Sequence, residues 1–250
     1  MNYRFCRKAK LASLVLMGIC ELSWNDPARA ISLGSGLDLD VTVTAVSDYR
    51  DTGISQTRGD PALQTEAVLQ HESGLYLGAF ASNVDFGTDT RLETMYFVGA
   101  TVPFSEQVYF DTYVGRYEYP KEAYADYNEF YAELGVYGFQ LGYTYSFDNR
   151  GHVPNNSNVF LAYNFVLPYK SNLQVRYGYS NVRADAFWSS DGDVRRSFHD
   201  WEVKLSKEIY GVNAFLSYID TDLSKSECLS ATGFDDTCSA TLVVGVSKTF

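Results

Sequence analysis

The feature of this sequence that most restricts its fold is a repeated alternation of apolar and polar residues with a period of two. In residues 139–147, an apolar side chain stands at every odd position. The pattern recurs in residues 159–165 and 201–206, and no sustained helical period follows residue 30. Because successive side chains of a strand point to opposite faces, each such segment predicts a strand with one apolar face.

Twelve segments show this alternation, and each is close to the roughly nine to eleven residues that a tilted strand needs to cross a bilayer. Aromatic residues make up 16% of the chain, with 20 Tyr and 16 Phe, and these side chains favour pleated sheet. The predicted strands are residues 38–50, 62–72, 75–83, 91–102, 107–118, 127–136, 139–148, 158–167, 172–181, 198–208, 211–220 and 240–250.

The connections between these predicted strands alternate between short and long. The short ones are residues 73–74, 103–106, 137–138, 168–171 and 210–211, and the long ones are 51–61, 84–90, 119–126, 149–157, 182–197 and 221–239. Short periplasmic turns, long external loops and an even number of strands are typical of bacterial outer-membrane barrels. A soluble β-sandwich has similar strand spacing but no reason to sort its connections by length.

The polar faces of the predicted strands indicate which side points inward. They are rich in small residues and carry both charge signs, as a crowded wet lumen requires, whereas the apolar faces carry Tyr and Phe near strand ends. The mean hydropathy of −0.19 fits, because only alternate residues would meet lipid. We therefore predict an all-β fold for residues 31–250, a transmembrane antiparallel up-and-down β-barrel of about 12 strands surrounded by outer-membrane lipid.

The first thirty residues have the three parts of a secretory signal peptide. These parts are a basic segment at residues 4–10, an apolar run at residues 11–20, and small residues at Ala28 and Ala30. The run is too short to cross a membrane as a helix. Ile19 stands where a lipoprotein signal at Cys20 would need a small residue. We predict that residues 1–30 are removed and that the chain is exported to the bacterial outer membrane.

Charge and cysteine content exclude several classes of function. The formal net charge is −11 at pH 7, so the chain lacks the basic face that nucleic-acid binding requires. Three His, four Cys and no CxxC or HExxH motif leave little material for a metal site, and we expect no metal. Cys228 and Cys238 are the only cysteines after the predicted signal peptide. Their place in one loop of an exported chain predicts a disulfide.

Two stretches of the chain match a known family pattern beyond strand rhythm. Residues 47–64 read SDYRDTGISQTRGDPALQ, and residues 71–87 read HESGLYLGAFASNVDFG. Together they resemble the TorF family of porins, which shows SDYxxxGxSQ, then PAxQ, then ExGxYxGxWxSNVDFG. The matching residues include Ser47, Asp48, Tyr49, Gly53, Ser55, Gln56, Pro61, Ser82, Asn83 and Asp85, with Phe80 where Trp is usual. The resemblance implies an exported porin-like barrel, in which these residues mostly suit turns and strand ends.

The chain ends in Phe250, on an alternating segment with Leu242, Val244 and Val246. A C-terminal aromatic residue on such a segment resembles the signal that bacterial outer-membrane proteins present to the barrel-assembly machinery. Lys248 departs from the usual apolar choice in that signal. We predict that the last strand contacts this machinery.

The charged residues on the predicted inner faces are mostly acidic. The pore-lining candidates are Asp40, Asp48, Glu66, Asp111, Glu129, Glu133, Arg176, Glu202 and Lys204, and Asp38 and Glu93 share those faces. A narrow acidic lumen would favour cations. Alternatively, these charges pair across a plugged interior, because buried charges must be paired. Twelve strands fall between filled eight-stranded barrels and open sixteen-stranded porins, so we expect a narrow passage.

These patterns predict a diffusion channel for small hydrophilic solutes or cations that uses no cofactor. No GxSxG motif occurs, and of His71, His152 and His199 only His199 lies at a predicted strand end, so we expect no enzyme activity. The alternatives are a closed barrel with a structural or surface-interaction role, an outer-membrane enzyme that uses His199, and a soluble periplasmic barrel that binds an apolar ligand. The sequence does not reveal the solute or the oligomeric state.

Overall fold

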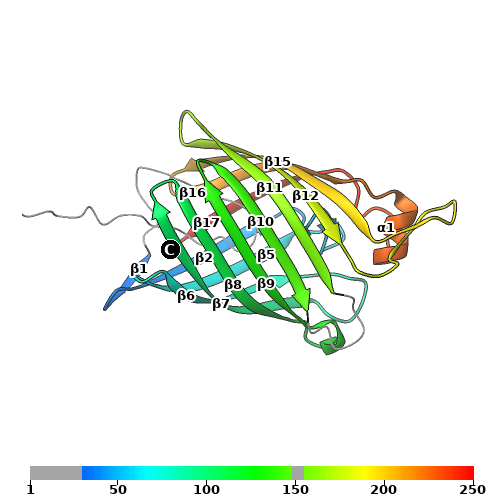
Figure 1. Cartoon of the computed structure of the whole chain (residues 1–250), viewed down its shortest axis with the longest axis horizontal. Helices are drawn as coiled ribbons and strands as arrows, with labels where there is room; N and C mark the ends of the chain where they lie inside the picture. Colours follow the sequence, from blue (N-terminus) through cyan, green and yellow to red (C-terminus); the bar gives the residue numbers. More distant parts are fainter. Residues whose placement is uncertain (1–29, 148–154) are drawn as a thin grey trace, which may run out of the picture.

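Twelve antiparallel strands close into one barrel in the computed structural model, which describes residues 30–147 and 155–250 (Figure 1). The strands are β2 (Leu37–Val46), β5 (Ala62–His71), β6 (Leu75–Asn83), β7 (Leu92–Ser105), β8 (Val108–Glu118), β9 (Tyr127–Val136), β10 (Phe139–Phe147), β11 (Asn156–Leu167), β12 (Ser171–Asn181), β15 (Ser197–Ile209), β16 (Val212–Thr221) and β17 (Thr241–Thr249). Each strand pairs with its neighbours in sequence, and β2 pairs with both β5 and β17, which closes the sheet. The predicted barrel is confirmed, whereas the predicted signal peptide, apart from Ala30, lies outside the described residues.

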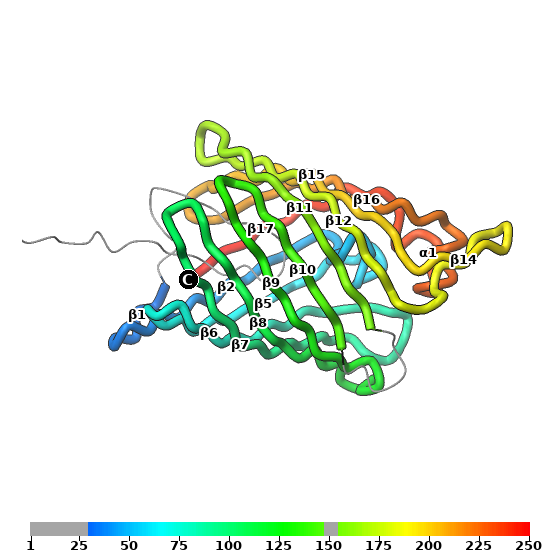
Figure 2. The backbone as a smooth tube through the Cα atoms, in the orientation of Figure 1, coloured from blue at the N-terminus to red at the C-terminus, as the bar shows by residue number. Residues whose placement is uncertain are grey.

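Short turns gather at one end of the barrel and long loops at the other, as the alternation of connection lengths predicts (Figure 2). We call these ends the turn end and the loop end. At the turn end, Tyr137 and Gly138 have φ values of 50° and 88°, and Tyr210 and Gly211 have 52° and 74°. Two consecutive residues with positive φ form the tight hairpin turn whose twist suits neighbouring antiparallel strands.

The loop end carries short elements that the alternation does not predict. They are β3 (Arg50–Asp51), β4 (Ile54–Ser55), the 3-10 helix η1 (Ala123–Ala125), β13 (Phe187–Trp188), β14 (Val194–Arg195) and the helix α1 (Lys225–Thr232). Ser224 caps α1, and Glu227 completes a capping box. Gly233, with φ of 84°, ends the helix. The eight residues of α1 are too few to show a helical period in the sequence. No helix in the described part of the chain is long and apolar enough to cross a membrane.

The first barrel strand differs from its predicted range of 38–50. It ends at Val46, because the chain then turns off the wall and residues 47–61 fold toward the barrel interior. A further strand, β1 (Ile31–Gly34), pairs with the start of β2 at the turn end. It occupies the edge of β2 that β17 leaves open, because β17 reaches only as far as the contact between Phe250 and Val41.

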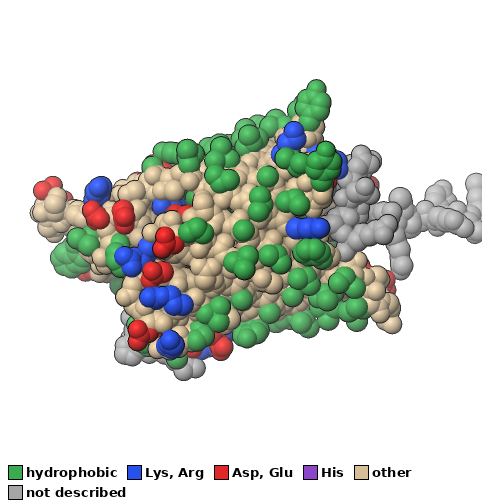
Figure 3. All heavy atoms as spheres, turned by 180° about the vertical axis from the view of Figure 1, so that it is seen from behind, with side chains coloured by type: hydrophobic (Ala, Val, Ile, Leu, Met, Phe, Trp, Pro, Cys, Tyr) green, Lys and Arg blue, Asp and Glu red, His purple; other side chains and the backbone are tan. Residues whose placement is uncertain are grey.

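The outer surface of the barrel is apolar, and the lumen side is polar or small. On β11, Val159 and Leu161 are 44% and 53% exposed, whereas Asn158 and Ala162, which flank this pair in the sequence, are 2% and 3% exposed. Figure 3 shows hydrophobic side chains over the barrel wall, with most of the acidic and basic side chains on that face toward the loop end. This is the inside-out distribution of a membrane barrel, in which lipid takes the place of a protein core.

Part of the barrel interior is filled by an aromatic cluster. Side chains from the strands β6 to β9 pack there, including Tyr76, Phe80, Met95, Phe97 and Tyr113. Tyr76 meets Phe97 edge-on at 6.1 Å, and Tyr113 stacks on Tyr131 at 4.9 Å between ring centroids. The cluster fills part of the space beside these strands and so narrows the lumen.

Candidate functional site

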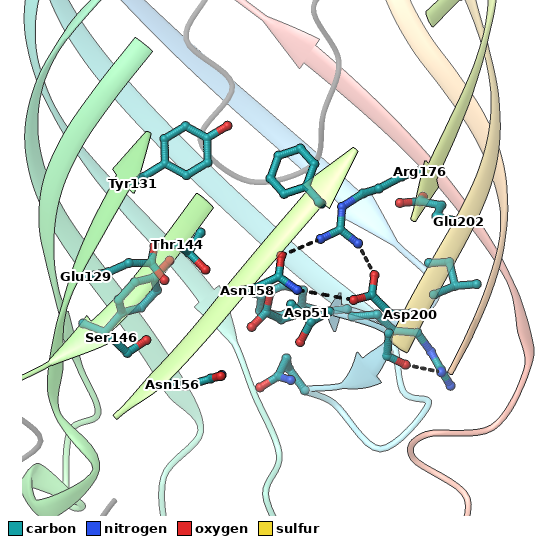
Figure 4. Close-up of a pocket in the computed structure, with 18 of the residues that line it drawn as sticks. Asp51, Glu129, Tyr131, Thr144, Ser146, Asn156, Asn158, Arg176, Asp200 and Glu202 are labelled. Carbon is teal, nitrogen blue, oxygen red and sulfur yellow. Dashed lines mark hydrogen bonds and ion pairs between the residues drawn. The ribbon is translucent and has the colours of Figure 1, made fainter. Parts of the chain in front are cut away.

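A polar chamber of about 270 Å³ lies inside the barrel (Figure 4). One wall consists of residues on β10, β11, β12 and β15, the other wall consists of residues on β7, β8 and β9, and the tip of the 47–61 loop enters from the loop end. The charged side chains that line it are Arg50, Asp51, Glu93, Glu129, Glu133, Arg176, Asp200 and Glu202. The chamber is therefore lined by six carboxyl groups and two guanidinium groups.

The first wall is organised around Arg176 on β12. Its guanidinium group forms an ion pair with Asp200 on β15 and donates to Asn158 Oδ1 on β11 at 3.1 Å. Asn158 in turn donates to Ser180 Oγ at 2.9 Å. Gly178 makes this arrangement possible, because a Cβ atom there would lie 2.4 Å from Asp200 Oδ1. The alternation of β12 places Arg176, Gly178 and Ser180 on the lumen face, so one strand supplies three parts of the cluster.

The second wall carries carboxyl groups that accept hydrogen bonds from tyrosine hydroxyls. The bonds are Tyr109 to Glu133 (2.6 Å), Tyr131 to Glu133 (2.7 Å), Tyr113 to Glu129 (2.5 Å), Tyr49 to Glu93 (2.9 Å) and Tyr119 to Glu93 (2.8 Å). These three glutamates make no ion pair with a described basic residue. The rings hold the carboxyl groups in place, and the donors satisfy them without adding positive charge.

Arg50 fixes the path of the 47–61 loop. Its guanidinium group bonds to Asp48 Oδ2 (2.6 Å), to the carbonyl oxygens of Gly53 (2.9 Å) and Ser239 (2.8 Å), and to Thr241 Oγ1 (2.9 Å). Asp48 also accepts from Ser55 Oγ at 2.5 Å. The loop is thus tied to the chain around β17 by a buried ion pair and its hydrogen bonds.

The same loop delivers Asp51 into the chamber, between its two walls. Burial inside the barrel raises the pKa of Asp51 above its usual value; the positive charge of Arg176 lowers it, and the negative charge of Asp200 raises it further. The Asp51 side chain is surrounded by the barrel but faces the open chamber, so it is enclosed by protein and still accessible from inside the lumen. Asp51 makes no ion pair with another described residue.

The structure brings together some of the predicted pore-lining residues and separates others. Glu129, Glu133, Arg176 and Glu202 line the chamber. The rest lie elsewhere. Asp48 lies at the base of the 47–61 loop, and Asp111 accepts a hydrogen bond from Thr101 Oγ1 at 2.6 Å. Asp40 and Glu66 lie on the paired strands β2 and β5, and Lys204 is buried with its Nζ 4.1 Å from the centre of the Phe215 ring. No group of three His, Cys, Asp or Glu suited to a metal ion occurs in the part of the chain that the structure describes.

Sequence reasoning missed Asp51, Asp200, Asn158 and the inward tyrosines. Tyr113 has the same parity as Asp111 on its strand, so the alternation alone could have placed it inside. Asp51 carries no such signal, because the predicted strand of residues 38–50 ends just before it. Its position follows from the path of the loop.

The residues of the family-like motifs connect neighbouring strands and loops. Asn83 accepts from the Leu63 amide at 2.7 Å and donates to the Pro61 carbonyl at 3.0 Å. Asp85 accepts at its carboxylate from the Gly87 amide at 2.8 Å, and its own amide donates to Gln56. The remaining contacts are Ser47 Oγ with the Val244 amide, Ser55 and Asp48, Tyr49 with Glu93, Ser82 with Gln64, and Gly53 against Thr221.

The other predicted residues lie at the ends and on the outside of the barrel. Cys228 and Cys238 form the predicted disulfide within the loop that carries α1. Phe250 is half exposed beside Lys248, and its backbone pairs with Val41. His199 faces outward between the rings of Tyr177 and Tyr179, at 5.3 and 5.1 Å.

A second charged cluster ties the loops together at the loop end. Arg195 bonds to Glu227 Oε1 at 2.6 Å and to Asp222 Oδ2 at 2.9 Å. Burial tends to raise the pKa of Glu227, but Arg195 and the hydrogen bonds from Ser224 hold that pKa below its ordinary value. This cluster joins β14 to the helix α1, outside the chamber.

Known proteins similar to this chain share its barrel. The KdgM porin matches with a TM-score of 0.52 and 7% identity, over 84% of this chain and 99% of that chain. The NanC porin matches with a TM-score of 0.52 and 8% identity, over 84% and 97%. At such identities the similarity concerns the fold alone. No curated protein sequence matches this chain. A family described as "Bacterial protein of unknown function (Gcw_chp)" matches residues 31–250, and the chain belongs to this family.

Proposed function

We propose that this protein is an outer-membrane channel through which small hydrophilic solutes or cations diffuse along a narrow acidic passage. The observation that carries the proposal is the chamber, a polar and charged space of about 270 Å³ enclosed by a barrel with an apolar outer surface. Polar groups along a water-filled path replace part of the hydration of an ion or solute as it passes. Diffusion needs no cofactor and no covalent step, so we expect no enzymatic activity.

The export route and the assembly of the barrel belong to the same proposal. Residues 1–30 would direct export, and Phe250 would present the last strand to the barrel-assembly machinery. The TorF-like residues between 47 and 87 support a porin-type role, since several of them build the loop that enters the lumen. Outer-membrane lipid would cover the apolar surface of the wall.

The charged groups that line the chamber indicate which solutes it suits. The KdgM porin has been solved in complex with disordered oligogalacturonate, at a TM-score of 0.50 and 8% identity to this chain. Galacturonate units carry carboxylates. In this chain both guanidinium groups that line the chamber are already bonded to aspartates, while Asp51 and Glu202 add carboxylates without an ion pair to a described residue. Cations and neutral solutes suit such a chamber better than a polyanion.

Single-channel recording tests the proposal. The chain without residues 1–30 would be refolded in detergent, checked for the heat-dependent gel mobility of a folded barrel, and added to planar bilayers in a potassium chloride gradient. We expect small discrete current steps and a reversal potential that indicates a preference for K⁺ over Cl⁻. Chain denatured by heat before addition is the control. A folded barrel that gives no steps would refute the channel.

A closed barrel with a structural or surface-interaction role is the second candidate. The aromatic cluster inside the barrel favours it, because Met95, Tyr113 and their neighbours are almost completely buried there. In that case the same recordings would stay silent, and the chamber would be an enclosed cavity rather than part of a passage.

A further inference from the structure

The chamber is lined by the 47–61 loop as well as by the barrel wall. Tyr49, Arg50, Asp51, Thr52, Gly53 and Gln56 all line the chamber, although none of them belongs to a barrel strand. The tip of the loop packs against β15 and β16. A Cβ atom on Gly53 would lie 2.4 Å from Thr221 Cγ2 and 3.2 Å from Asp200 Cβ. The φ value of 85° at Gly53 completes this turn without strain.

The loop is held in this position by contacts at both sides of its tip. Before the tip, Arg50 bonds to the carbonyl oxygen of Ser239 and to Thr241. After the tip, the Ser55 amide donates to the Thr237 carbonyl at 2.9 Å. Thr237 precedes Cys238, so the segment that accepts this hydrogen bond lies within the loop that the Cys228–Cys238 disulfide closes. The backbone on both sides of Asp51 is therefore fixed.

Asp51 lies near charged groups on both walls of the chamber. Its charge interacts with Arg176 and Asp200 on the first wall. It also interacts with Glu93 and Glu129 on the second wall. Figure 4 shows Asp51 below the Arg176, Asp200 and Asn158 cluster, with Glu129 on the far side of the chamber. Asp51 therefore lies between charged groups of both walls, at the open volume of the chamber.

Asp51 differs from its charged neighbours in the partners that it has. Arg176 is bonded to Asp200 and Asn158, and Arg50 is bonded to Asp48, so each guanidinium group already has a carboxylate partner. The carboxyl groups of Glu93 and Glu129 are held by tyrosine hydroxyls. Asp51 has neither kind of partner among the described residues, and its side chain contacts the open volume.

We propose that Asp51, carried into the lumen on the 47–61 loop, is the residue that determines the charge selectivity of this channel. The inference rests on the proposed channel function and names the residue that sets its preference for cations. A fixed carboxylate at a constriction attracts cations and repels anions over a distance comparable to the width of a narrow pore. Wall residues such as Glu202 then modulate the preference rather than set it.

The test compares reversal potentials of the full mature barrel and three variants in the same potassium chloride gradient. Asp51→Asn keeps the size of the side chain and removes its charge, and Glu202→Gln does the same on the wall. Asp235→Asn, in an exposed part of the disulfide-closed loop, is the matched control. Heat-dependent gel mobility shows whether each variant has folded.

We expect Asp51→Asn to lower the K⁺ over Cl⁻ permeability ratio about 25-fold, because one unit charge about 4 Å away in water changes the permeability of each ion about fivefold, in opposite directions. Glu202→Gln should lower the ratio less, and Asp235→Asn should leave it unchanged. Asp51→Lys, which reverses the charge, should lower the ratio further than Asp51→Asn.

Two results would overturn the inference in different ways. A conducting wild-type barrel whose ratio survives Asp51→Asn, or falls more with Glu202→Gln, would place selectivity in the wall and leave the channel function intact. A folded wild-type barrel without current steps would refute the proposed function itself, and the role of Asp51 with it.

Discussion

The attachment of the 47–61 loop can be broken at one buried ion pair. The side chains of Arg50 and Asp48 are each 3% exposed, and the Arg50 guanidinium group makes four hydrogen bonds of 2.6 to 2.9 Å. Arg50→Gln removes the cation and leaves Asp48 buried without it. Loss of one partner of a buried pair typically costs about 3–5 kcal/mol. The hydrogen bonds between the barrel strands do not involve this pair. The loss therefore destabilises the observed position of the 47–61 loop, which we call its closed position, rather than the barrel itself.

Limited proteolysis measures that cost. Trypsin can cut after Arg58, which in the closed loop lies 4.0 Å from the centre of the Phe234 ring and 3.6 Å from Asp85. When opening is fast relative to cleavage, the rate follows the open population. A loss of about 3 kcal/mol raises that population roughly a hundredfold, since about 1.4 kcal/mol corresponds to a factor of ten. We expect cleavage after Arg58 to accelerate by about this factor.

A double variant separates the loss of bonds from the unpaired charge. Asp48→Asn combined with Arg50→Gln removes both charges, so cleavage after Arg58 should slow again toward the wild-type rate. The gel mobility of the folded barrel should be the same in all of these proteins. A cleavage rate in Arg50→Gln within about twofold of wild type would refute the reasoning, because the ion pair would then not hold the loop.

Three further predictions concern other parts of the barrel. Replacement of Cys228 and Cys238 by Ser opens a loop with a sequence separation of 10, which should destabilise it by about 3 kcal/mol; proteolysis of that loop should quicken, and a reductant should reproduce the change in wild type only. The folded-state pKa of Glu227 is lowered, so its ion pair with Arg195 stabilises the loop above pH 4.5 and is lost as the pH falls through the folded-state pKa. Hydrogen exchange in α1 should show this loss, and Glu227→Gln should abolish the pH dependence. Leu161→Arg on the wall should cost about 2–4 kcal/mol in denaturant unfolding from lipid vesicles, whereas Leu229→Arg on α1, equally exposed, should cost little; equal effects would contradict a lipid-covered wall.

The strand pattern was readable from sequence because a membrane barrel has only two environments. Leu161 meets the outside and Asn158 meets the lumen, and every residue of the wall takes one side or the other by parity. The path of the 47–61 loop was not readable in this way. It depends on Arg50 reaching Ser239, 189 positions later, and a contact so distant in sequence leaves no local signal. The same holds for Arg176, Asp200 and Asn158, whose parity was visible but whose mutual bonds depend on three strands.

The charge of the lumen depends on which groups are bonded to one another, and a count of acidic residues does not give it. Arg176 and Asp200 form a pair with little net charge, although both face the chamber. The carboxyl groups of the tyrosine-lined wall are fixed by neutral donors, as Glu133 is by two hydroxyls and an amide. Asp51 lies on a loop that the strand pattern assigns to the outside, yet it reaches the open volume without a partner cation among the described residues. Four of the six carboxyl groups that line the chamber are therefore held by partner side chains, whereas Asp51 and Glu202 are not, and this difference is the reason to test Asp51 as the residue that sets the ion preference.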